Sequence, residues 1–411
     1  MSVAGRHRRS LVEGLLLGFS FLLPMTIAAA EALFIGAIIV WMVIERRRGL
    51  RNAVRNPYFW PVLGFLAVAG IGILWSVRPD ISLGRAHRLL FPAGIFVVAA
   101  TYRVDRGEGN TPLAASVIAF ISGCAVRAVY DLVRVPWQVT HGVSLYDTGN
   151  MRDPQMYLAS LCLLLAVTQC GASHRWRALS ASAILVQGMG LILHFKRGVW
   201  IAFCLAVCTM GAWTRRWRML AALALLVGSS LLVPQVRQRI ALLREVSETS
   251  TGGRYAMWSE VAPVLLREYP QGMGWSAVTH EDLLPHAEYL QPGLNHLHNN
   301  LLQVALETGW LGLAAWILWM GVALWVMWRN ARDTTDDLVA CLSLGVMCAF
   351  IGLLANGMVE YNFGDTEILM LMCLLMGWSA AVAPRAQAGG GSNSPSSHAN
   401  RSPGVANSPS S

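Results

Sequence analysis

A histidine with hydrogen-bonding neighbours stands at the start of an apolar stretch late in the chain. In "HNNLLQVALETGWLG", which begins at His298, the apolar run is long enough to form a helix. Free N–H groups at a helix start favour the neutral imidazole, which can accept a proton. We therefore predict that His298 is a general base, and that His296, Asn299 and Asn300 orient it or bind sugar hydroxyls. The alternative is a histidine that only hydrogen-bonds at a helix end.

Cationic residues stand at the starts of other apolar runs. Lys196 and Arg197 are adjacent in "HFKRGVW", Arg254 follows two glycines in "TGGRYAMW", and Arg85 and Arg88 are three residues apart in "SLGRAHRLL". Helix starts bind anions, and arginine offers a planar fork that suits phosphate. Convergence of these five side chains on one cavity would fit a diphosphate ligand. The alternative is that each contacts lipid headgroups.

Metal and cofactor chemistry find little support in the sequence. His286, His296 and His298 lack a helical pair of ligands four residues apart and a convincing carboxylate partner, so we predict no metal site. No phosphate-binding loop, dinucleotide fingerprint or paired-aspartate metal motif is present. The eight cysteines fall in apolar runs, and we expect no disulfide framework. We predict no cofactor, so an activated substrate such as a lipid diphosphate sugar must supply the energy.

The composition indicates that the scaffold which positions these residues is a membrane protein. Of 411 residues, 55% are hydrophobic and only 13% are charged, against roughly 25% charged in soluble domains. Long apolar runs recur along nearly the whole chain, which predicts an all-α polytopic bundle in contact with membrane lipids. The net charge of +9 is dispersed in short clusters between these runs, so it encodes topology and predicts no nucleic-acid partner.

The apolar runs predict twelve transmembrane helices, and cationic clusters at every second connection place both termini in the cytoplasm. We expect helices one to nine in residues 1–234, a periplasmic loop subdomain in 235–297, helices ten to twelve in 298–384 and a disordered tail in 385–411. The predicted spans are 11–29, 31–44, 57–75, 88–102, 112–131, 154–171, 178–195, 198–214, 219–234, 299–328, 338–359 and 365–383.

Two amphipathic helices are predicted in the large periplasmic loop. One lies in "VRQRIALLREV". The other lies in "GGRYAMWSEVAPVLLREYP", with Trp258, Val261 and Leu265 on one face, and "PQGMGW" breaks it. Arg127 and Asp131, four residues apart within a span, are expected to pair.

The opening stretch resembles a family signature. His298, Asn299, nine residues, Gly309, two residues and Gly312 match the H-[NSQ]-x9-G-x-x-[GTY] pattern of the O-antigen ligase and polymerase superfamily. The segments "KRGVW", "GGRYAMW" and "GMGW" and the twelve-span layout with one large outer loop are also similar to that family. We expect the two glycines to allow close helix packing.

The resemblance implies a metal-independent, inverting glycosyltransferase in the inner membrane of a Gram-negative bacterium. Such a ligase moves O-antigen polysaccharide from undecaprenyl diphosphate, its donor, to a sugar hydroxyl on lipid A–core, its acceptor, on the periplasmic side. The family's essential histidine maps to His298 and its outer-face arginines to Arg197 and Arg254. Lys196 departs from the family's usual pattern, which leaves its role open.

Three other functions stay open at this point. Within the superfamily, the alternatives are an O-antigen polymerase and a protein O-oligosaccharyltransferase, and the absence of an added outer domain favours the ligase. Outside it, a transporter of lipid-linked glycans would need charges along a route through the membrane. The charges instead concentrate at the outer rim, which favours surface chemistry.

Overall fold

The structure is a computed structural model that describes residues 3–103, 111–144, 150–169, 174–230, 232, 234, 237, 254, 257–286 and 295–382. Within these residues the chain is all helical. The helices are, in chain order, α1 (Val3–Leu22), α2 (Ile27–Val54), α3 (Phe59–Gly72), η1 (Ile73–Trp75), α4 (Pro79–Gly84), η2 (Ala86–Leu90), α5 (Ala93–Thr101), α6 (Thr111–Thr140), α7 (Arg152–Val167), α8 (His174–Leu193), α9 (Arg197–Thr214), α10 (Trp217–Ser230), η3 (Met257–Val261), α13 (Ala262–Glu268), α14 (His280–Leu283), η4 (Leu284–His286), α15 (Asn300–Asp333), α16 (Asp337–Asn356) and α17 (Thr366–Val382).

Several helices have the length and apolar character of membrane spans. Five reach 18 residues or more, within α2, α6, α9, α15 and α16, and five shorter apolar helices accompany them. Each of the twelve apolar runs predicted from the sequence overlaps at least one helix of the described part, although several helices begin or end outside the predicted bounds. The chain is therefore a multi-pass helical membrane protein, while the count of twelve spans stays a prediction.

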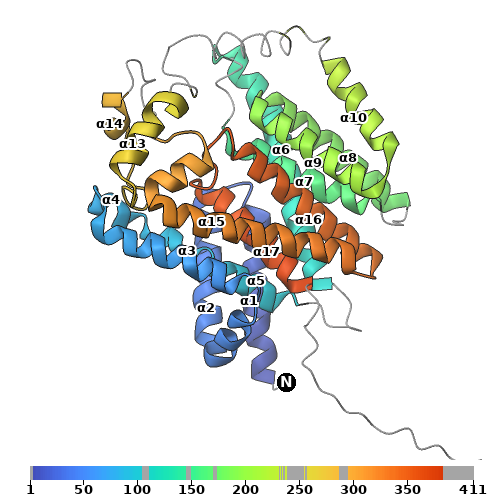
Figure 1. The fold of residues 1–411 in the computed structure, drawn as a ribbon. Coiled ribbons are helices and arrows are strands. Elements are labelled where there is room, and N and C mark those ends of the chain that lie inside the picture. Colours follow the sequence, from blue (N-terminus) through green and yellow to red (C-terminus); the bar gives the residue numbers. More distant parts are fainter. Residues whose placement is uncertain are drawn as a thin grey trace, which may run out of the picture.

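The core lies around the last two helices. In α17 nearly every side chain from Thr366 to Ala381 is buried, as expected for a helix that is apolar all round. It packs against α5, and α16 packs against α7, α9 and α15, so the C-terminal helices cross the middle of the bundle (Figure 1). Residues at the ends of these central helices are thereby held by neighbours from the whole chain.

Connections that are far apart in sequence meet at one end of the bundle. The Val77 N–H donates to the carbonyl of Met273, and the Asn300 N–H donates to that of Gly357. The short helices α4, α13 and α14 lie together at this end, to the left in Figure 1. All of these connections belong to the side that the cationic clusters predict to be periplasmic.

The structure tests several local predictions. The amphipathic helix in "GGRYAMWSEVAPVLLREYP" is confirmed as η3 and α13, with Val261 and Leu265 buried and Trp258 partly buried. Nearly all of "VRQRIALLREV" lies outside the described residues. The expectation of no disulfide framework has one exception among the described residues, since Cys341 is disulfide-bonded. Packed membrane helices can bring cysteines of separate apolar runs together, which their sequence positions do not reveal.

Candidate active site

The start of α15 explains why polar residues precede an apolar helix. Asn299 is the N-cap, and its Oδ1 accepts hydrogen bonds from the N–H groups of Leu301 (2.9 Å) and Leu302 (3.2 Å). These groups lack partners within the helix, and a capping asparagine supplies one. The Asn299 Nδ2 donates to the carbonyl of Met358 at 2.8 Å, which ties the cap to the connection between α16 and α17.

Asn300 fastens the same helix start to the same connection. Its buried Nδ2 donates to the Asn362 Oδ1 at 2.7 Å, and its Oδ1 accepts from the Phe363 N–H at 3.1 Å. Asn362 in turn donates to Gln155 of α7 at 2.7 Å. The hydrogen bonds of Asn299 and Asn300 thus join the start of α15 to the connection between α16 and α17.

His298 stands just before this cap in an unusual backbone conformation. Its φ is +49°, a backbone conformation that residues other than glycine seldom adopt. Such a conformation persists only where surrounding contacts fix it. The Nδ1 atom lies 2.7 Å from Oε1 of Glu360, and the side chain keeps 16% exposure. The histidine is thus held by a carboxylate from 62 residues further along the chain and still reaches solvent.

The Glu360 carboxylate joins two of the predicted site residues. While Oε1 faces His298, Oε2 accepts from the Arg254 guanidinium at 2.7 Å. Burial acts to raise the pKa of Glu360, but the hydrogen bond with His298 and the charges of His298 and Arg254 outweigh it and lower that pKa. The carboxylate is therefore ionised near neutral pH and can only accept hydrogen bonds.

The charge of Glu360 fixes the tautomer of His298. Because an ionised carboxylate donates no hydrogen, Nδ1 carries the hydrogen, and in the neutral imidazole Nε2 then has the lone pair. A buried or half-buried carboxylate that fixes the imidazole in this way is what a general base requires. The geometry assigns Nε2 as the atom able to take a proton.

His296 lies edge-on to His298, with ring centroids 4.1 Å apart. Its Nδ1 accepts from the His298 N–H at 3.2 Å, which helps to hold the strained backbone. Burial and the neighbouring charge of His298 lower the pKa of His296 to about 4. His296 is therefore neutral near pH 7 and serves as an acceptor.

The same three side chains could hold a metal ion, which the sequence did not reveal. Ligand atoms of His296, His298 and Glu360 all lie within 4.8 Å of one another, whereas His286 is not in the group. The sequence argument against a metal site relied on the lack of a carboxylate partner, and Glu360 is such a partner. A metal ion would compete with the Nδ1 contact and place a second cation beside Arg254, so the hydrogen-bonded arrangement fits these residues better.

Lys196 and Arg197 are placed next to the same connection. The helix α9 begins at Arg197, one residue before the predicted span, with Lys196 as its N-cap residue. A Cβ atom on Gly198 would lie 2.9 Å from Oδ1 of Asn356 and 2.9 Å from Val359. The start of α9 therefore lies against Val359, the residue that precedes Glu360.

Arg85 and Arg88 hold two loops around the site. Arg85 donates from Nη1 to the carbonyl of Ser276 at 2.9 Å, and Arg88 donates from Nη1 to that of Gly364 at 3.0 Å. The buried Nε of Arg88 has no hydrogen-bond partner. Both arginines reach the same end of the bundle as Glu360, but one N–H group of each serves a backbone carbonyl.

The signature glycine Gly309 breaks α15 instead of packing it against another membrane helix. Its φ is +70° and its ψ is −178°, a conformation open mainly to glycine. A Cβ atom there would lie 2.5 Å from the carbonyl carbon of Gln271. The break admits the "PQGMGW" loop, where Gly272 (φ +92°) makes the reciprocal close approach. Close packing is thus confirmed at Gly309, but its partner is this loop.

A buried polar network around Glu307 joins α15 to the residue that follows the "PQGMGW" loop. Glu307 accepts from the Ser276 N–H (3.0 Å), from Gln303 Nε2 (2.9 Å) and from the Tyr361 hydroxyl (3.0 Å). Gln303 also accepts from the Leu297 N–H at 2.8 Å, next to His298. The hydrogen bond between Leu297 and Gln303 fixes the segment before His298 relative to α15.

A second charged cluster lies between α6, α7 and α8. Arg127 and Asp131 form the expected ion pair at 3.6 Å, although Asp153 at 2.7 Å is the closer partner of Arg127. Tyr157 and His194 both contact the Oδ2 of Asp131, at 2.6 and 3.0 Å. Asp131, Asp153 and His194 have ligand atoms close enough for a metal, but the adjacent arginines already neutralise the carboxylates.

Sequence reasoning missed Glu360 and the network of Glu307, Gln303 and Tyr361. The available signal was the polar segment "VEYNFGDTE" between the last two apolar runs, which is expected on the same side as His298. Charged residues at a short connection have many possible roles, so this signal alone does not select Glu360.

One comparison with known proteins identifies part of the chain. Residues 181–317 match a family model described as O-Antigen ligase. This segment contains Lys196, Arg197, Arg254, His298 and the two signature glycines, and it ends before Glu360. No curated protein matches the chain. Residues 181–317 are thus similar to the O-antigen ligase family, and the match agrees with the resemblance to the O-antigen ligase and polymerase superfamily that the His298 signature predicts.

Proposed function

We propose that this chain transfers O-antigen polysaccharide from undecaprenyl diphosphate to a sugar hydroxyl of lipid A–core, which completes lipopolysaccharide. The observation that carries the proposal is the Glu360 carboxylate, which joins His298 and Arg254 through two contacts of 2.7 Å. A proton acceptor and a phosphate-binding cation are thereby held at a fixed separation. These are the two groups that transfer from a lipid diphosphate sugar requires.

The reaction proceeds as a single displacement. Nε2 of His298 removes the proton of the acceptor hydroxyl, and the hydroxyl oxygen attacks the anomeric carbon of the donor. The bond from that carbon to the phosphate oxygen breaks, undecaprenyl diphosphate leaves with the electron pair, and the anomeric configuration inverts. Glu360 stabilises the imidazolium that forms, as the carboxylate of a catalytic triad does.

Arg254 and Arg197 stabilise the departing diphosphate, with Lys196, Arg85 and Arg88 as helpers. An arginine has five N–H donors, so Arg254 can bind phosphate while one N–H stays with Glu360. Its side chain is 43% exposed, which leaves it accessible to a donor. The donor brings its own energy, so the proposed reaction needs no cofactor and no metal.

The proposed site lies on the periplasmic side of the inner membrane of a Gram-negative bacterium. Both termini are then cytoplasmic, residues 1–234 and 298–384 carry the membrane helices and residues 235–297 form the periplasmic subdomain. The contacts that join the connections at one end of the bundle support this arrangement, because they gather the predicted site residues on a single side.

Ligation in a purified system tests the proposal. The mixture contains the full chain, an undecaprenyl-diphosphate-linked glycan, lipid A–core and EDTA, and the products are separated on a glycan-stained gel. We expect a ladder of glycosylated lipid A–core from the wild type and none from folded His298→Ala or Arg254→Ala. Arg78→Ala is the matched control, because Arg78 pairs with Glu281 and Asp282 at the same end of the bundle.

Four outcomes would overturn this assignment in different ways. Unmodified lipid A–core with a lengthened lipid-linked glycan would establish a polymerase, and glycosylation of an added acceptor protein would establish a protein O-oligosaccharyltransferase. Movement of intact lipid-linked glycan across vesicles would establish a transporter. Loss of wild-type activity in EDTA, with recovery on adding zinc, would assign His296, His298 and Glu360 to a metal instead.

A further inference from the structure

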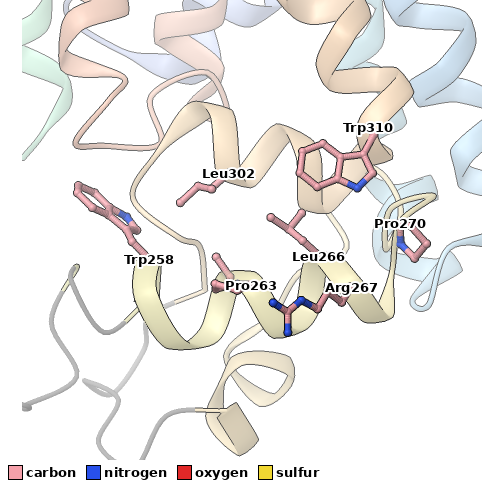
Figure 2. A pocket seen from close by; sticks show the side chains of 8 residues that line it. Trp258, Pro263, Leu266, Arg267, Pro270, Leu302 and Trp310 are labelled. Carbon is pink, nitrogen blue, oxygen red and sulfur yellow. The ribbon is translucent and has the colours of Figure 1, made fainter.

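An apolar groove runs along α13 beside the first half of α15. It encloses about 470 Å³, within the roughly 300–1,000 Å³ typical of ligand sites. Figure 2 shows Trp258 at one end and Trp310 towards the other, with Leu302 and Leu266 between them. Pro263 and Arg267 of α13 also line it.

The groove is a consequence of how α13 packs. The helix buries Val261 and Leu265 in a small core with Leu306 of α15, which leaves Leu266 only partly covered. At its far end the break at Gly309 precedes Trp310, which is 55% exposed. The walls of the groove are therefore two helices whose positions are fixed by other contacts, so the groove does not need a bound ligand to stay open.

The groove begins next to the proposed active site. The indole N–H of Trp258 donates to the carbonyl of Leu297 at 2.7 Å, and Leu297 directly precedes His298. Leu302 follows His298 by four residues, and Arg254 precedes Trp258 by four. A molecule bound at Arg254 and His298 can therefore extend directly into the groove.

The lining favours a hydrocarbon chain over a sugar. It consists of tryptophan, leucine, proline and alanine side chains, and its one charged member is Arg267. Sugar hydroxyls need hydrogen-bond partners when they are buried, and these side chains offer few. A chain of methylene and methyl groups needs no hydrogen-bond partners and packs against such side chains.

We propose that this groove holds the isoprenoid chain of the lipid diphosphate donor, an inference that rests on the proposed function. In such a donor the chain is bonded directly to the diphosphate, so its first units must lie close to Arg254. The acyl chains of lipid A–core are separated from the attacking hydroxyl by the core oligosaccharide. Proximity of the groove to Arg254 therefore favours the donor.

Arg267 and Trp310 indicate how the chain enters. Arg267 is exposed and has no ion-pair partner among the described residues, and Leu311 beside Trp310 is 70% exposed. Tryptophan and arginine gather where lipid headgroups meet the hydrocarbon, because each combines apolar and polar parts. The groove thus opens at the membrane interface, where an isoprenoid chain leaves the bilayer.

Photolabelling of the full chain in phospholipid vesicles tests the assignment. The probe is a benzophenone-bearing polyprenyl diphosphate without sugar, and cross-linked peptides are located by mass spectrometry. We expect label on residues 257–270 and 300–311, competed by unlabelled undecaprenyl phosphate. Leu266→Trp fills the groove and should remove most of this label, because the indole occupies the space that the chain would take.

Val264→Trp is the matched control, because Val264 lies on the same helix, is 43% exposed and does not line the groove. Label on other helices of the wild type, or equal labelling of Leu266→Trp and wild type, would overturn the assignment. So would competition by lipid A–core but not by undecaprenyl phosphate. Groove labelling without any glycan transfer would uphold the groove and refute the proposed function, and transfer with label elsewhere would do the reverse.

Discussion

Replacement of Glu360 by glutamine separates the two tasks of its carboxylate. An ionised carboxylate accepts hydrogen bonds at both oxygens, here from His298 at Oε1 and from Arg254 at Oε2. A glutamine amide accepts at its oxygen and donates at its nitrogen. One of the two partners must then face an N–H₂ group, whichever way the amide turns.

Each orientation has its own kinetic result. If the amide nitrogen faces His298, Nδ1 becomes the acceptor, Nε2 carries the hydrogen, and the base is lost. General-base catalysis contributes roughly 10²- to 10⁴-fold, so kcat falls by that factor, or about 2.7–5.5 kcal/mol. If the nitrogen faces Arg254, KM for the donor rises, because the arginine is no longer held. Glu360 is 7% exposed, so water cannot easily replace the lost oxygen.

The assay is steady-state transfer to lipid A–core at varied pH for wild type, Glu360→Gln and Glu281→Gln. Glu281 is the matched control, since it pairs with an arginine at the same end of the bundle but is 77% exposed. We expect Glu281→Gln to retain wild-type kcat and KM. A Glu360→Gln enzyme with kcat and KM within threefold of wild type would refute the role of this carboxylate.

Three further predictions concern the frame of the site. Gly309→Ala should destabilise the fold by about 1–3 kcal/mol from backbone strain alone, and the added Cβ atom would also clash with Gln271. The measurement is the denaturation temperature, which should fall. An unchanged temperature would show that residue 309 does not need the backbone conformation that breaks α15. The pKa of His296 is about 4 in the fold and about 6.5 when unfolded, so the unfolded chain binds more protons between these values. Stability should therefore fall by up to about 3 kcal/mol as pH drops from 6.5 to 4, and His296→Asn should flatten this dependence. Asn299→Ala should cost about 1 kcal/mol through lost capping, and an equal Tm for this variant and wild type would show that the cap is dispensable.

Local sequence patterns predict one wall of the groove but not the groove itself. The periodic spacing of Val261 and Leu265 predicts a helix with one buried face, and α13 has that face. It does not predict which helix covers the face or what stays open beside it. That depends on α15, which breaks at Gly309 because a separate loop approaches its backbone.

The sequence by itself determined the features that depend on neighbouring residues. Apolar runs fix an all-helical membrane protein, since backbone groups in lipid must bond within their own segment. The signature that begins at His298 predicts the similarity to the O-antigen ligase family, and "KRGVW" predicts the start of α9 to within one residue. Each of these follows from composition or spacing within about twenty residues.

Only the tertiary structure decided the chemistry of the site. His298 and Glu360 are 62 residues apart, and their contact follows from the packing of α15, α16 and α17. Arg254 reaches the same carboxylate from a third segment. Local propensity cannot encode such a meeting, because the free energy that holds it comes from side chains buried throughout the bundle. The carboxylate that contacts His298 was therefore present in the sequence, but its role could not be recognised there.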